Sequence, residues 1–203
     1  MKKDANGGAT RPAMMTRPLA NDGAIGTEPE RCKEDAVNHT WTCSCCGRTF
    51  DTLPMDYGFV APRNWFGLPE AERSTRAKLT DDICTIDDTE RYVRGCLEIP
   101  VSGSSESLIW GVWVSVSEES FRYILARWSS PIAPDESPRF GWLSTWINGY
   151  PGPSEIRCNI FLQSGNLRPR IVLQPTEYPL AVEQHRGITL DRVKEIAAGA
   201  GHL

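Results

Sequence analysis

The chain has 203 residues and a formal net charge of −4, and 40% of its residues are hydrophobic. This length and composition indicate one domain with enough apolar side chains for a sizeable core. A mildly acidic chain has no electrostatic attraction to nucleic acid or to an anionic membrane, so neither is expected as a partner. The sequence has no apolar run of bilayer length and no secretory signal, so we expect a cytoplasmic protein.

The first 38 residues differ in composition from the rest of the chain. They contain no Phe, Trp or Tyr and are rich in Gly, Pro, Ala, Thr and charged side chains. Such a segment cannot bury enough apolar surface to offset the entropy lost on ordering. We therefore expect a disordered tail over 1–38 and a single domain over 39–203. Met14 and Met15 are candidates for an alternative start of translation.

The segment 39–50 contains a cysteine knuckle, "CSCCG". Cys43 and Cys46 have the spacing of two ligands of one zinc ion, and Gly47 allows the tight turn between them. A closed tetrahedral site needs two further ligands, and the sequence offers Cys45, Cys32, His39, Cys84 and Cys96. We favour Cys84 and Cys96 among these, because each is expected on a strand. A packed, metal-free turn is the more ordinary explanation of the knuckle, and a structural zinc ion is the alternative.

A redox role of the knuckle is disfavoured. A thioredoxin-like pair opens a helix, whereas "RTFDTLP" follows the knuckle here. With an odd number of cysteines and no secretory signal, a disulfide framework is not expected either.

The next elements are a loop, a helix and two strands. Residues 51–68 alternate turn formers with aromatics and predict an ordered loop. Residues 68–79 predict a surface helix with acidic residues in its first turn. Residues 90–101 and 107–116 have the alternation and the β-rich composition of strands. Arg94, Cys96 and Glu98 would share one face of the first strand.

The remaining chain predicts two helices and a hairpin. Residues 117–128 have an apolar residue at every third or fourth position after the N-cap Ser117. A short element is expected near 140–146, a hairpin of strands over 156–163 and 169–175, and a helix over 190–198 that Thr189 caps. Strands and helices are interspersed along the chain, but they do not follow the repeated strand–helix–strand order of βαβ units. The prediction is an α+β domain with a mainly antiparallel sheet flanked by helices.

Several segments together resemble a known family: "CSCCG", "RGCLEIPV", "WGVWVSVSEESF", "FGWLSTW" and "LRPRIVLQPTEYPLAVEQHRGITLDRV". They are similar to the bacterial family called domain of unknown function 2199, from about Trp41 to about Ile196. The resemblance implies a bacterial cytosolic setting and no particular activity. The chain departs from the pattern of this family at two places. Phe50 stands where the family often has a histidine, and Glu177-Tyr178 stands where it usually has Asp-His.

Three functional hypotheses remain. The first is a non-catalytic protein-binding or regulatory module, because the chain has three histidines and no recognised catalytic motif. The aromatic loop residues Trp142, Trp146 and Tyr150 are its candidate contacts, although burial in the core explains them more simply. The second hypothesis is the zinc domain. The third is an enzyme that uses Cys96 or the face of Arg94 and Glu98, for which an exposed ion pair is the ordinary explanation.

Overall fold

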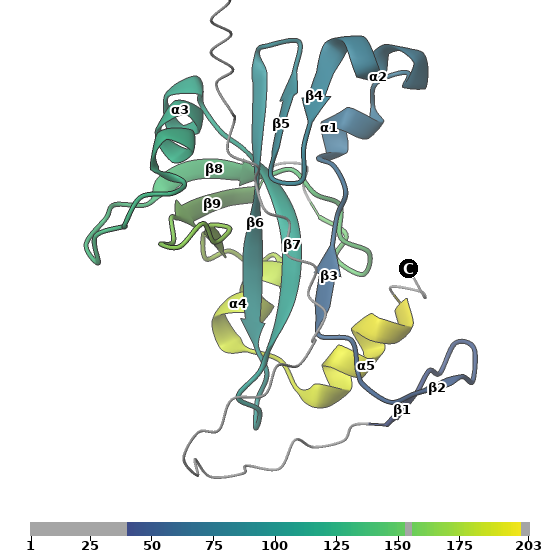
Figure 1. Cartoon of the computed structure of the whole chain (residues 1–203). Coiled ribbons are helices and arrows are strands. Elements are labelled where there is room, and N and C mark those ends of the chain that lie inside the picture. Colours follow the sequence, from purple (N-terminus) through teal and green to yellow (C-terminus); the bar gives the residue numbers. More distant parts are fainter. Residues whose placement is uncertain (1–39, 153–155, 200–203) are drawn as a thin grey trace, which may run out of the picture. The chain divides into compact units, whose positions relative to one another are not determined.

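The computed structural model of the chain describes residues 40–152 and 156–199 (Figure 1). The predicted tail over 1–38, the candidate ligands Cys32 and His39, and the last residues of the chain lie outside this range. Within it, helices and strands are both present, as the sequence predicts.

The centre of the fold is a closed barrel of five strands rather than an open sheet. Each strand pairs antiparallel with the next along the chain, and the last returns to the first as a parallel neighbour. The inward side chains are fully buried aliphatic residues such as Val93, Leu97 and Ile171. The five strands are β6 (Glu90–Pro100), β7 (Ser107–Ser115), β8 (Arg139–Leu143), β9 (Ile156–Phe161) and β10 (Arg170–Leu173).

The barrel closes where β10 meets β6. Arg170 faces Cys96 across this seam, and the Cys96 amide donates to the Pro169 carbonyl at 2.9 Å. The neighbouring Gly95 is required here by close approach. A Cβ atom at Gly95 would lie 2.6 Å from the Ile171 side chain and 2.7 Å from the Pro169 oxygen.

A buried amide completes the seam, because β10 and β6 share only this short pairing. Gln184, on α4 (Pro179–Arg186), accepts from the Leu173 amide at 2.8 Å and donates to the Ile171 carbonyl at 2.7 Å. The side chain therefore pairs backbone groups of β10 that would otherwise be buried without partners. Helix α4 was not predicted from the sequence.

Three short strands extend the barrel sheet. They are β3 (Asp56–Gly58), which pairs parallel with β7, and β4 (Ala77–Leu79) and β5 (Ile83–Ile86), which continue from β6. A second, smaller core lies on the outer side of this extension, beside α1 (Arg63–Phe66) and α2 (Glu70–Arg76). It is centred on Trp113, whose indole N–H donates to the Phe59 carbonyl at 2.8 Å.

Two further helices match the sequence closely. Helix α3 (Glu118–Arg127) begins after Ser117, whose hydroxyl accepts from the Ser120 amide, and buries Phe121 and Ile124. Helix α5 (Leu190–Gly199) begins after Thr189, which accepts from the Arg192 amide. The hydrogen-bonding caps and the apolar faces confirm both predictions.

Other expectations need correction. The predicted helix over 68–79 ends at Arg76, because residues 77–79 leave the helix to pair with β5 as β4. The predicted loop over 51–68 contains β3 and α1. The predicted antiparallel sheet flanked by helices is matched only in part: most strand pairs are antiparallel, but a parallel pairing distant in sequence closes five of the strands into a barrel. The hairpin of β9 and β10 is confirmed.

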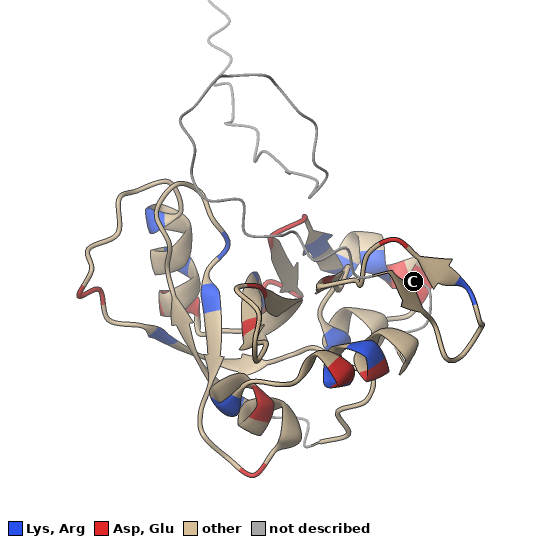
Figure 2. Cartoon of the chain, turned by 90° about the horizontal axis from the view of Figure 1, so that it is seen from below, with Lys and Arg blue, Asp and Glu red and all other residues tan. Residues whose placement is uncertain are grey.

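Charges of both signs alternate on the ribbon, most visibly along the helices (Figure 2). Several are (i, i+3) or (i, i+4) pairs, such as Arg76 with Glu72 and Lys194 with Asp191. Among the residues that the structure describes, no helix combines the length and apolarity needed to cross a bilayer.

Candidate functional site

The cysteine knuckle is a small hairpin of β1 (Trp41–Thr42) and β2 (Thr49–Phe50). The Trp41 and Phe50 rings stack with centroids 5.5 Å apart, and Trp41 is buried against the main core. This contact anchors the hairpin to the domain, so the turn between its strands is held in a defined position.

The turn of the hairpin gathers the cysteines. The Gly47 amide donates to the Cys43 carbonyl, and the Cys43 amide donates to the Arg48 carbonyl, both at 2.8 Å. Gly47 has a φ of +70°, which glycine adopts without the strain that a side chain would bring. The spacing of the "CSCCG" motif therefore predicts the turn correctly.

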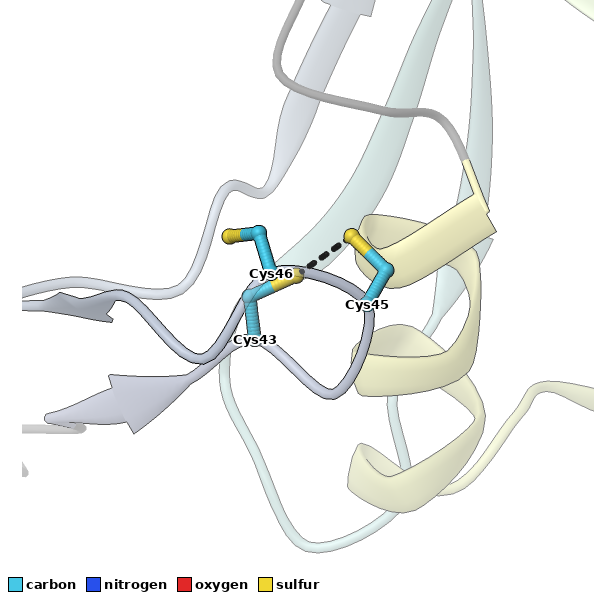
Figure 3. A group of neighbouring side chains, drawn as sticks. All are labelled: Cys43, Cys45 and Cys46. Atoms are coloured by element: carbon cyan, nitrogen blue, oxygen red, sulfur yellow. Dashed lines mark hydrogen bonds between the residues drawn. The ribbon is translucent and has the colours of Figure 1, made fainter.

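The three thiols of the turn form a cluster (Figure 3). The sulfur atoms of Cys43, Cys45 and Cys46 all lie within 4.8 Å of one another. Cys43 is buried, whereas Cys45 and Cys46 are exposed. The Cys43 and Cys45 sulfurs are 2.9 Å apart, and Figure 3 shows the Cys46 sulfur on the other side of Cys43. This is the group of metal-ligating side chains that the described residues bring together.

Hydrogen bonds prepare one of these thiols for metal binding. The Cys45 thiol and the backbone amides of Cys45 and Cys46 donate to the Cys43 sulfur, which lowers the pKa of Cys43 to about 7. The same contact raises the pKa of Cys45 to about 11, because the shared proton stays on Cys45. A thiolate is the form that binds zinc, so Cys43 is poised to act as the first ligand.

The donor set fits zinc in chemistry and nearly in geometry. Zinc–sulfur bonds of about 2.3 Å in a tetrahedron place the sulfurs about 3.8 Å apart. The Cys43 and Cys45 sulfurs, at 2.9 Å, would have to separate by about 1 Å to admit the ion. Cys45 is exposed, so a change of its rotamer meets little resistance. Three thiols leave one position for a further ligand.

The structure does not bring the predicted ligands Cys84 and Cys96 to the knuckle. Cys84 lies on β5 in the second core, and burial raises its pKa to about 12. Cys96 lies on β6 at the barrel seam, and burial raises its pKa as well. Both thiols therefore favour the protonated form, which is the form of ordinary core cysteines.

The predicted face of β6 is formed, but its residues do not pair as expected. Among the described residues, no ion pair joins Arg94 to Glu98. The Arg94 guanidinium instead donates to the Asp81 carbonyl at 3.4 Å, and its Nε is buried with no hydrogen-bond acceptor. Burial and the nearby Arg168 lower the pKa of Arg94. The protonated Cys96 in this setting does not resemble an activated nucleophile.

The three aromatic loop residues differ in their burial. Tyr150 is buried in the main core, and its hydroxyl donates to Glu183. Trp142 is half-buried on β8. Trp146 is 74% exposed, with the Arg63 guanidinium 5.7 Å from its ring centre. Core packing therefore explains Tyr150 but not Trp146.

Two hollows adjoin this loop and contain residues that the sequence did not indicate. One, of about 440 Å³, is lined by Arg63, Trp146 and Tyr178 among others. The other, of about 700 Å³, is lined by Trp142, Arg157 and Tyr178 among others. The alternation of β9 places Arg157 outward, which is the one local signal in the sequence for its role.

Comparison with known proteins identifies the family. A search of curated proteins and a search of solved structures each found no match. The family model described as "Uncharacterized protein conserved in bacteria (DUF2199)" matches residues 42–188, which include the three cysteines of the knuckle, the whole barrel and α4. The chain therefore belongs to the DUF2199 family of uncharacterised proteins conserved in bacteria.

Proposed function

We propose that the chain is a non-catalytic barrel module whose cysteine knuckle is held by a structural zinc ion. The observation that carries the proposal is the cluster of three sulfurs within 4.8 Å in one turn. Ionisation of one thiol opposes ionisation of its neighbours, because the second thiolate to form is repelled by the first. A zinc ion removes that repulsion.

The role of the ion would be structural. The hairpin consists of two strands of two residues each, which is too short to be stable by itself. A metal ion across its turn would supply the missing free energy. Four protein ligands leave no open position for chemistry. For the fourth ligand the sequence offers Cys32 and His39, which precede the hairpin.

Metal content tests this proposal directly. Elemental mass spectrometry of untagged protein should find about one zinc ion per chain, and the Cys43→Ser/Cys46→Ser variant should lose it. The Ser44→Ala variant, altered in the same turn, is the control and should keep the ion. A wild-type protein without metal, purified without chelator, overturns the proposal. If the wild type does bind zinc, the metal content of Cys32→Ser and of His39→Ala identifies the fourth ligand.

A second candidate function is binding of a protein partner. The specific observation is the exposed Trp146 ring beside a hollow. Tryptophan is frequent among residues that dominate protein interfaces, and it is otherwise strongly buried. Co-purification from the native cell should yield a partner that Trp146→Ala loses. Leu167→Ala, which removes another exposed apolar side chain, is the control. A partner retained equally by both variants contradicts this surface.

A further inference from the structure

The two hollows beside the aromatic loop share part of their lining, and the surface that they cover together is here called the aromatic track. Both are lined by Pro151, Gly152, Ile156 and Tyr178, so the two hollows are adjacent. One extends to Trp146 and Arg63, and the other extends to Trp142 and Arg157. The track is thus longer than either hollow, which suits an extended ligand better than a compact one.

The charge of the track differs from that of the chain. Its described lining residues include Arg63 and Arg157 and no aspartate or glutamate. The chain as a whole has a net charge of −4. Neither arginine forms an ion pair with a carboxylate of residues 40–152 or 156–199. Two cations at the two ends of one surface are therefore left without a charged partner among these residues.

Aromatic rings hold the two arginines in place. The Arg63 guanidinium lies 5.7 Å from the Trp146 ring centre, and that of Arg157 lies 5.3 Å from the Trp142 ring centre. A guanidinium over a ring keeps its N–H groups, which lie in its own plane, available to acceptors at its edge. A carboxylate is the acceptor that matches two of these N–H groups at once.

We propose that the aromatic track binds an extended acidic segment of a partner protein. Carboxylates of that segment accept from Arg63 and Arg157, and its apolar groups contact Trp146 and Tyr178. The proposal rests on the protein-binding function proposed above and names the chemistry of its partner. Single-stranded nucleic acid offers anions and stacking bases too, but the acidic chain would repel its dense backbone charge.

Peptide probes of matched shape test the proposal. The first is a short fluorescein-labelled peptide of alternating glutamate and proline, which stays extended because proline opposes helix formation. The second replaces glutamate by glutamine, and the third is a short labelled oligothymidylate. Fluorescence anisotropy with the full chain should show that the acidic peptide binds, that its affinity falls with added salt, and that the glutamine peptide binds about tenfold more weakly.

Variants locate the binding. Arg63→Gln and Arg157→Gln should each weaken the acidic peptide about fivefold and leave the glutamine peptide unchanged. Arg122→Gln removes the same charge from the exposed face of α3 and should change neither. Trp146→Ala should weaken both peptides. Unchanged melting curves would show that the variants remain folded.

The other outcomes are informative in different ways. Equal binding of both peptides, lost in Trp146→Ala, overturns the acidic partner but keeps the protein-binding surface. No binding of either peptide overturns the proposed acidic segment, and the co-purification test of Trp146→Ala then decides the surface separately. Tighter binding of the oligothymidylate than of the acidic peptide would overturn the choice of a protein partner.

Discussion

The Cys43 and Cys45 sulfurs lie 2.9 Å apart, and this contact moves their two pKa values in opposite directions. The Cys45 thiol donates its proton toward Cys43, so Cys43 ionises more readily and Cys45 less readily than a cysteine in an unfolded chain. The two sulfurs therefore share one proton, and a metal ion that bound to both would displace that proton.

This pair predicts how the stability of the metal-free protein depends on pH. The pKa of Cys43 is lowered from 9.0 to about 7, so its ionisation favours the folded state as the pH rises from about 7 to about 9. That contribution is lost as the pH falls through about 7. We expect the difference in urea midpoint between chelator-treated wild type and Cys43→Ser to shift in favour of the wild type as the pH rises from about 7 to about 9.

A control in the same turn separates the thiol from general effects of pH. The urea midpoint of Ser44→Ala should keep a constant difference from wild type between pH about 7 and about 9. Cys45→Ser replaces the thiol donor by a hydroxyl group on a shorter side chain, so the hydrogen bond to Cys43 weakens. The increase in urea midpoint relative to Cys43→Ser should therefore be smaller in this variant. If the urea midpoints of wild type and Cys43→Ser changed by the same amount over this window, Cys43 would not ionise in it.

Zinc retention distinguishes the knuckle from the two buried thiols. Cys84 and Cys96 belong to the barrel and its extension, and neither joins the sulfur cluster. We expect Cys84→Ser and Cys96→Ser to lower the melting temperature by disturbing packing and yet to keep the zinc of wild type. Cys46→Ser should lose the metal. Metal analysis of the three variants, prepared identically, makes the comparison.

The opposite result would restore the assignment favoured by the sequence. If Cys84→Ser or Cys96→Ser emptied the site while remaining folded, these thiols would be ligands, and the hairpin would have to move toward the barrel. Circular dichroism of each variant establishes whether loss of metal reflects loss of folding.

Gln184 should be among the most sensitive polar residues of the fold. It is 9% exposed and hydrogen-bonds both the Leu173 amide and the Ile171 carbonyl of β10. Gln184→Ala leaves both groups buried without partners, so the free energy of unfolding should fall by about 2 to 3 kcal/mol. Gln174→Ala, at a half-buried position just beyond β10, should cost about 0.5 kcal/mol or less. If urea unfolding gave the same loss of free energy for Gln184→Ala and Gln174→Ala, water would have to replace the Gln184 amide as the hydrogen-bond partner of β10.

Local signals in the sequence predicted the elements that depend on local physics. Helix α3 follows from the Ser117 cap and the apolar period that buries Phe121 and Ile124. The turn of the knuckle follows from its cysteine spacing and Gly47. In each case the residues that decide the structure are neighbours in the chain, so one short stretch contains the whole argument.

The rest depends on contacts between distant residues. The antiparallel sheet predicted from the strands closes into a barrel through a single register pair, Arg170 with Cys96, which no periodicity encodes. The aromatic track joins Arg63 to Arg157 across loops that the sequence does not orient. The family membership is carried by motifs along most of the chain, but those motifs do not state which surfaces face each other.

The closure of the barrel can be tested by a pair of substitutions at the seam. Gly95→Ala places a methyl group against the Ile171 Cδ1 atom and the Pro169 oxygen, so it should lower the free energy of unfolding by about 1 to 3 kcal/mol. Ile171→Val removes that Cδ1 atom and should cost about 1 kcal/mol in the wild type. In the Gly95→Ala background it should cost less, because it removes one of the two Ile171 atoms that the methyl group would meet at 2.6 Å. Gly199→Ala, with no atom within 4 Å of the added carbon, is the control without a clash and should not lower the free energy of unfolding. Strictly additive losses in urea unfolding would mean that the two positions do not touch, and the seam between β10 and β6 would then be more open than the structure places it.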